Sequence, residues 1–168
     1  MPSETINWKI NDLLTFKHTL RYTDADAQQK NTYHQGFSEG SDSKLIRTAY
    51  TTNEKMTNWA TDNQLAYSLI TDNTSHNLLL GVDYQKTDST AKYADAMYNG
   101  VPIIDLSDPD YDLFSKTALS LTGYQQTDDI EQSQFGVYLQ DEMQWNKLTV
   151  VAGLRHDDYK STNKTTAT

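Results

Sequence analysis

Six segments of this chain alternate apolar and polar side chains with a period of two residues, and this alternation limits the fold more than any other feature. In the fourth segment, Leu80 and Val82 alternate with Gly81 and Asp83. A period of two is that of a β-strand with one apolar face, whereas an amphipathic helix repeats at i, i+3, i+4 and i+7. None of the six keeps the helical spacing, so we predict an all-β protein. The six segments span about residues 6–11, 14–22, 45–70, 78–85, 135–140 and 148–155.

The overall composition fits a sheet with one wet face. Only 36% of the residues are hydrophobic and the mean hydropathy is -0.74, against about 45–50% apolar residues in a typical soluble domain. Aromatic residues make up 11% of the chain, with 11 tyrosines, which is too many for a simple disordered polymer. The chain is therefore too polar for a large two-sided core and too aromatic for disorder.

The connections between the six segments alternate between short and long. Short polar turns are predicted near residues 11–13, 71–75 and 145–147, and long polar stretches at about 24–44 and 86–131. Short turns at one end and long loops at the other are typical of outer-membrane barrels. Opposite the apolar positions stand charged residues such as Lys17, Arg21 and Arg155, which suit a hydrated lumen. We predict an antiparallel up-and-down transmembrane β-barrel segment of about six strands, incomplete; a soluble β-sandwich, which also alternates, is the alternative.

Charge and residue usage exclude several classes of protein. The chain has no cysteine, which excludes a disulfide scaffold and cysteine-ligated metal sites. Its net charge of -9, without a basic stripe, argues against nucleic-acid binding. No apolar run approaches the roughly 18–20 residues of a membrane helix. No signal peptide is visible at the first residues, so we expect either an internal piece of a longer membrane protein or an engineered segment of one.

Residues 135–159, FGVYLQDEMQWNKLTVVAGLRHDDY, resemble a hairpin that recurs in TonB-dependent siderophore receptors. A G-x-Y-x-Q-D strand, a W-[DN]-[KR] turn and a G-x-R-[YH]-D strand follow one another there in the same order. The segments HNLLLGVDYQ (76–85) and VPIIDLSDP (101–109) are similar to receptor segments as well. Order and spacing look most similar to the ferrichrome and hydroxamate-siderophore branch.

The resemblance implies an outer-membrane receptor and transporter for ferric siderophore, hydroxamate type preferred, energised through TonB and surrounded by outer-membrane lipid. It implies no enzyme and no resident cofactor. Across 1–168 we expect a partial barrel domain, because neither a plug domain nor the full set of 22 strands is present. Two alternatives stay open, a passive porin-like barrel and a soluble carbohydrate-binding β-sandwich.

The candidate ligand-binding residues are four aromatics in the long polar stretches: Tyr33, Phe37, Tyr93 and Tyr98. The resemblance implies this role, since hydroxamate-siderophore receptors hold their cargo with aromatic side chains above the barrel mouth. The chelator itself satisfies the ferric ion, so the protein needs apolar surface with a few hydrogen bonds rather than metal ligands. Plain packing within the loops is the competing interpretation for each of the four.

Two further groups are poor candidates for chemistry. The histidines, His18, His34, His76 and His156, are scattered without partners at triad or metal spacing. The acidic run Asp105, Asp108, Asp110 and Asp112 lacks the glycine and terminal glutamate of a calcium loop. We interpret the run as solvated loop charge.

Overall fold

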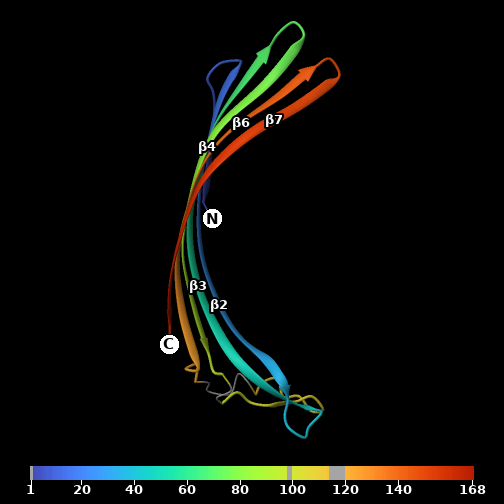
Figure 1. Cartoon of the computed structure of the whole chain (residues 1–168), viewed down its shortest axis with the longest axis vertical. Helices are drawn as coiled ribbons and strands as arrows, with labels where there is room; N and C mark the ends of the chain where they lie inside the picture. The colour runs from blue at the N-terminus through green and yellow to red at the C-terminus, as the bar shows by residue number, and fades with distance from the viewer. Residues whose placement is uncertain (1, 98–99, 114–119) are drawn as a thin grey trace. The chain divides into compact units, whose positions relative to one another are not determined.

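The computed structural model describes residues 2–97, 100–113 and 120–168. Within them the regular elements are all β-strands, joined into one antiparallel sheet in the order β1-β2-β3-β4-β6-β7, with β5 paired to β3 (Figure 1). No helix in this part of the chain is long and apolar enough to cross a membrane. The predicted all-β fold of about six antiparallel strands is confirmed, with the two-residue strand β5 in addition. The strands are β1 (Ser3–Lys9), β2 (Leu14–Phe37), β3 (Lys44–Ile70), β4 (Thr74–Asp95), β5 (Ile104–Asp105), β6 (Tyr124–Trp145) and β7 (Leu148–Ala167).

The strands run through two compact units. The turn-side unit comprises residues 1–24, 56–88 and 130–162, and the loop-side unit comprises residues 25–55, 89–129 and 163–168. The three short turns, at 10–13, 71–73 and 146–147, lie at one end of the turn-side unit (Figure 1). Their common position confirms the predicted up-and-down arrangement of neighbouring strands.

Local side-chain chemistry explains two of the short turns. Between β1 and β2 the side-chain oxygen of Asn11 accepts hydrogen bonds from the backbone N–H groups of Leu13, at 2.8 Å, and Leu14, at 2.9 Å. Between β6 and β7 Asn146 has a φ of 54°, a left-handed conformation that asparagine tolerates better than most residues. The β1–β2 register then places Trp8 opposite Phe16.

The strands are much longer than the apolar alternation predicted. β2 continues to Phe37 and β3 begins at Lys44, so the predicted long polar loop at 24–44 is wrong and the connection is only 38–43. Strand pairing persists where both faces are polar: Asn31 Nδ2 donates to Tyr50 Oη at 3.2 Å, and Thr51 Oγ1 donates to the carbonyl of Gln29 at 2.9 Å. Alternation therefore marks only the part of each strand that has an apolar face.

The second long polar stretch and the C-terminal residues need the same correction. β4 reaches Asp95 and β6 begins at Tyr124, which shortens the connection predicted at about 86–131 to residues 96–123. The polar sequence after Tyr159 is not a tail but a continuation of β7 to Ala167. Beyond it, Gln125 and Thr168 exchange backbone hydrogen bonds of 2.9 and 3.0 Å.

Very little apolar surface is buried in the described residues. Their buried apolar side chains are Ala49, Ala96 and Val101, with Leu121 packed against them, all in the loop-side unit. In the turn-side unit the apolar positions are open, and Leu80, Val82, Phe135 and Val137 are 36–46% exposed. A β-sandwich would bury these side chains between its sheets. The soluble-sandwich alternative is therefore wrong, and the barrel-wall prediction stands.

A pair of neighbouring residues tests the assignment of the faces. Leu139, 49% exposed, belongs to the apolar face of β6, and Gln140 to the polar face. We expect Leu139→Arg to destabilise the membrane-inserted protein by about 2–4 kcal/mol, because an arginine then faces hydrocarbon. Gln140→Arg should cost far less. Urea unfolding in lipid vesicles measures both, and an equal loss would contradict the assignment.

Candidate functional site

On the polar face of the turn-side unit, Tyr138 of β6 lies directly over Gly81 of β4. A Cβ atom at Gly81 would overlap the tyrosine ring, so the close approach requires glycine. The Tyr138 hydroxyl donates to Asp62 Oδ1 at 2.8 Å. Gln64 Nε2 donates to Tyr138 Oη at 3.0 Å and to Asp62 Oδ2 at 2.7 Å. The ring therefore connects β3, β4 and β6.

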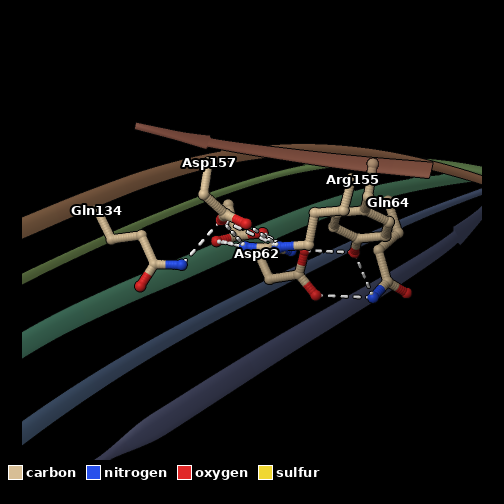
Figure 2. A network of polar contacts seen from close by, with 7 residues as sticks. Asp62, Gln64, Gln134, Arg155 and Asp157 are labelled. Atoms are coloured by element: carbon tan, nitrogen blue, oxygen red, sulfur yellow. Dashed lines mark hydrogen bonds and ion pairs between the residues drawn. The ribbon is translucent and has the colours of Figure 1, made fainter. Parts of the chain in front are cut away.

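Arg155 of β7 extends this network to a fourth strand (Figure 2). Its Nη1 and Nη2 donate to the two oxygens of Asp83 at 2.7 and 3.0 Å. Its Nε donates to Asp157 Oδ2 at 2.9 Å, and Gln134 Nε2 donates to Asp157 Oδ1 at 2.8 Å. The guanidinium also lies 5.5 Å from the centre of the Tyr138 ring. One cation thus holds two carboxylates in the forked geometry that arginine favours.

The network orders the polar face rather than forming a closed pocket. The Arg155 side chain is 40% exposed, so each ion pair contributes little stability on its own. Gly136 provides space for the guanidinium, because a Cβ there would overlap it. Beside the network is an open hollow of about 300 Å³. The hollow is lined by Thr19, Arg21, Ala60, Thr61, Asp62, Asp83, Tyr84, Gln85, Tyr138 and Arg155.

Gly81 and Gly153 provide a matched pair of substitutions. We expect Gly81→Ala to displace the Tyr138 ring, break its bond to Asp62 and destabilise the protein by about 1–3 kcal/mol, as overpacking does. At Gly153 an added Cβ meets its nearest atom at 3.4 Å, so Gly153→Ala should be nearly neutral. Chemical unfolding in detergent micelles compares them. Equal stability of the two variants would show that the ring does not depend on Gly81.

The loop-side unit holds a row of four tyrosines, one from each of four neighbouring strands. The ring centroids of Tyr33 and Tyr50 are 5.8 Å apart, those of Tyr50 and Tyr93 are 5.8 Å apart, and those of Tyr93 and Tyr124 are 6.1 Å apart. The middle pair is stacked, with an interplanar angle of 22°. We call these residues the tyrosine row. Offset and tilted contacts at this spacing are favourable.

Three of the four hydroxyl groups are engaged by neighbouring polar side chains. Tyr50 Oη accepts from Asn31 at 3.2 Å, while Tyr93 Oη donates to Asp95 Oδ2 at 3.3 Å and Tyr124 Oη donates to Gln126 Oε1 at 2.6 Å. Tyr93 lies beyond the apolar stretch of β4, and partial burial, with the Asp95 charge beside it, raises the pKa of its phenol to about 12. The phenol therefore stays protonated at neutral pH. The row offers ring surface rather than phenolate ligands.

Two of the four predicted binding residues, Tyr33 and Tyr93, belong to the row, although they lie in β2 and β4 rather than in loops. Phe37 stands at the end of β2, 54% exposed and apart from the ring contacts of the row. Tyr98 lies outside the described residues. Sequence reasoning missed Tyr50 and Tyr124.

Strand parity is the signal that could have found the two missed tyrosines. Tyr50 is 12 residues from Asp62 in β3, and Tyr124 is 14 residues from Tyr138 in β6. Even separations along a regular strand put both residues of each pair on one face. The alternation along each strand therefore gives Tyr50 the parity of Asp62, and Tyr124 the parity of Tyr138.

The acidic run makes local turn contacts. Asp105 accepts from the backbone N–H of Ser107 at 3.0 Å and from its hydroxyl at 2.6 Å, which holds the Asp105 pKa below its usual value. Asp110 accepts from the backbone N–H of Asp112 at 2.9 Å. Among the described residues, no cluster of three or more His, Asp or Glu side chains could hold a metal ion. These contacts fit solvated loop charge.

Two of the four histidines make single polar contacts on the apolar face of the turn-side unit. His18 Nδ1 lies 2.8 Å from Asn63 Oδ1, and His76 Nδ1 lies 2.9 Å from Asp141 Oδ2. Both pairs join side chains on neighbouring strands, β2 to β3 and β4 to β6. Each contact satisfies a polar group that would otherwise stand alone among apolar side chains.

Comparison with known proteins gives one family and several relatives. The family model described as TonB dependent receptor-like, beta-barrel, matches residues 3–168. A ferrichrome outer membrane transporter/phage receptor of Escherichia coli (strain K12) is 28% identical over 191 residues, covering 100% of this chain and 25% of the relative. A ferrioxamine B receptor of Salmonella typhimurium (strain SL1344) is 31% identical over 166 residues, covering 93% of this chain and 20% of the relative.

A ferrioxamine receptor of Yersinia enterocolitica is 33% identical over 165 residues, covering 92% of this chain and 22% of the relative. The chain thus spans between a fifth and a quarter of the length of these curated relatives. What the similarity covers is a section of barrel wall.

Proposed function

Because this chain belongs to the family of TonB-dependent receptor-like β-barrels, we propose that it forms part of the wall of a receptor that imports ferric hydroxamate siderophores. The chain lies in the bacterial outer membrane, and its family consists of receptors and transporters. Uptake is driven through TonB. The tyrosine row is the part of this wall that contacts the cargo.

The row is the observation that carries the assignment of the site. Four rings from β2, β3, β4 and β6 follow one another at about 6 Å spacing. Tyrosine offers a large rigid apolar surface with a polar edge, which is the surface that a partly apolar chelate needs. The bonds to Asn31, Asp95 and Gln126 fix three of the rings, so little side-chain entropy is lost when a ligand binds.

The protonated phenol of Tyr93 agrees with a cargo that keeps its own iron ligands. A ferric hydroxamate siderophore surrounds the metal with its own oxygen atoms, and a phenolate would have to displace one of them. The raised pKa of Tyr93 opposes that exchange. The row therefore supports recognition of the intact chelate by ring contact.

The relatives favour this function over a passive porin-like barrel. All three are named for ferric chelate uptake or binding, as a ferrichrome transporter or as receptors for ferrioxamines. A passive pore would need only a polar lumen, and the match extends over nearly the whole chain rather than over its polar positions alone.

Radioactive iron uptake tests the proposal. Cells that depend on the complete protein should accumulate iron from ferric trihydroxamates, and deletion of TonB should abolish uptake because barrel and plug alone supply no energy. Equal uptake with and without TonB would support the porin-like alternative. Failure to bind any ferric chelate would overturn the receptor proposal.

Substitution of a central tyrosine tests the row. We expect Tyr93→Ala to weaken ferric trihydroxamate binding by roughly tenfold, because it removes a ring from the middle of the row. Tyr93→Phe should retain most of the affinity. Tyr111→Ala is the control, since Tyr111 is 82% exposed in the connection 96–123. Equilibrium binding to the purified complete protein measures all three, and an unchanged Kd in Tyr93→Ala would remove the row from the site.

A further inference from the structure

The cationic side chains around the tyrosine row are sorted between the two faces of the strands, whereas carboxylates occur on both faces. The inference that follows rests on the proposed function, since it concerns which ferric chelates the row accepts. On the row face, contacts place two carboxylates beside the rings: Asp95 accepts from Tyr93 Oη, and Asp128 accepts from Gln126 at 2.6 Å, next to Tyr124. Glu54 shares their face, four residues from Tyr50 along β3.

Within the loop-side unit, most cations of these strands lie on the opposite face. Lys30, Lys92 and Lys164 each adjoin a residue on the row face, and successive strand residues point to opposite faces. These neighbours are Asn31, which bonds Tyr50; Tyr93 itself; and Thr165, which bonds Asp128. Lys55 follows the same rule and pairs at 3.4 Å with Asp26.

Lys44 is the exception among the described strand residues of the loop-side unit. It stands six residues from Tyr50, so the alternation puts it on the row face. Lys44 lies opposite Asp105 in the β3–β5 pairing, and its charge contributes to the lowered pKa of that carboxyl. The row face of these described residues therefore carries four carboxylates, Asp105 among them, against one cation, and that cation stands at an end of β3 opposite Asp105.

We propose that this sorting makes the tyrosine row selective for ligand charge, so that it takes neutral or cationic ferric hydroxamates and disfavours anionic ones. Asp95 and Asp128 are the specificity-determining residues. Asp95 accepts its hydrogen bond from a ring of the row, and Asp128 accepts from the side chain that Tyr124 contacts. A chelate with an ammonium tail is attracted to them, and one with a carboxylate tail is repelled.

Adjacent residues on β6 allow a test with a matched control. Asp128 is on the row face, whereas Asp129 is on the other face and accepts from Thr90 at 2.8 Å. Asp128→Asn and Asp129→Asn change the net charge of the protein equally. They differ only in the face of β6 on which the negative charge is removed. The probes are three derivatives of one ferric trihydroxamate, whose tail ends in an ammonium, an uncharged acetamide or a carboxylate.

Equilibrium Kd values are measured for the complete protein in detergent at low salt. The ammonium derivative should bind most tightly and the carboxylate derivative most weakly, with roughly a tenfold ratio between their Kd values. Asp128→Asn should reduce that ratio to about threefold, with the acetamide derivative unaffected as the control for folding. Asp129→Asn should leave the ratio of Kd values between the carboxylate and ammonium derivatives unchanged. Added salt should reduce this ratio in every variant.

Each other outcome has a defined meaning. Equal affinities for the three derivatives, or equal effects of the two substitutions, would overturn the charge selectivity while leaving the receptor function intact. If none of the three chelates bound, the proposed function itself would fail, which a separate uptake measurement would also show.

Discussion

Backbone hydrogen bonding between neighbouring strands is the interaction on which the other features of this protein depend. Few side chains are buried in the described part of the chain, so strand pairing rather than a packed core holds the sheet together. Pairing also sets the register that brings distant residues to one level. Tyr33 and Tyr124 are far apart in the sequence, yet they become the two ends of one row because β2, β3, β4 and β6 are neighbours.

Strand pairing and side-chain alternation together explain how one sheet can present an apolar face to lipid and a polar face to water. In the turn-side unit, residues such as Leu80 and Val137 expose an apolar face, while Arg155 and its carboxylates cover the other. Glycine at 81 and 136 lets Tyr138 and Arg155 lie flat on that polar face. In the loop-side unit both faces are polar, and most of the cations of the described strands lie on the face opposite the tyrosine row.

The sequence predicted the strands where one face is apolar and failed where both faces are polar. Residues 24–37 and 124–131 contain no apolar alternation, so the sequence pattern predicts loops there, although strand pairing extends through them. For the same reason, the sequence pattern identifies only some of the tyrosines of the row. Tyr33 and Tyr93 were found because they are aromatics in a polar stretch, whereas Tyr50 was hidden in a weakly patterned strand. The contact of Tyr138 with Gly81 needs the register between β4 and β6, which alternation within single strands does not contain.

The central claim is that the tyrosine row is where this wall meets its cargo. The most direct measurement is a structure of the complete receptor with a bound ferric trihydroxamate. The account predicts ring atoms of Tyr50 and Tyr93 within about 4 Å of the chelate, the distance of apolar contact, with the iron coordinated by the chelator alone. A chelate seated away from all four tyrosines, or a phenolate oxygen bound to the iron, would contradict it.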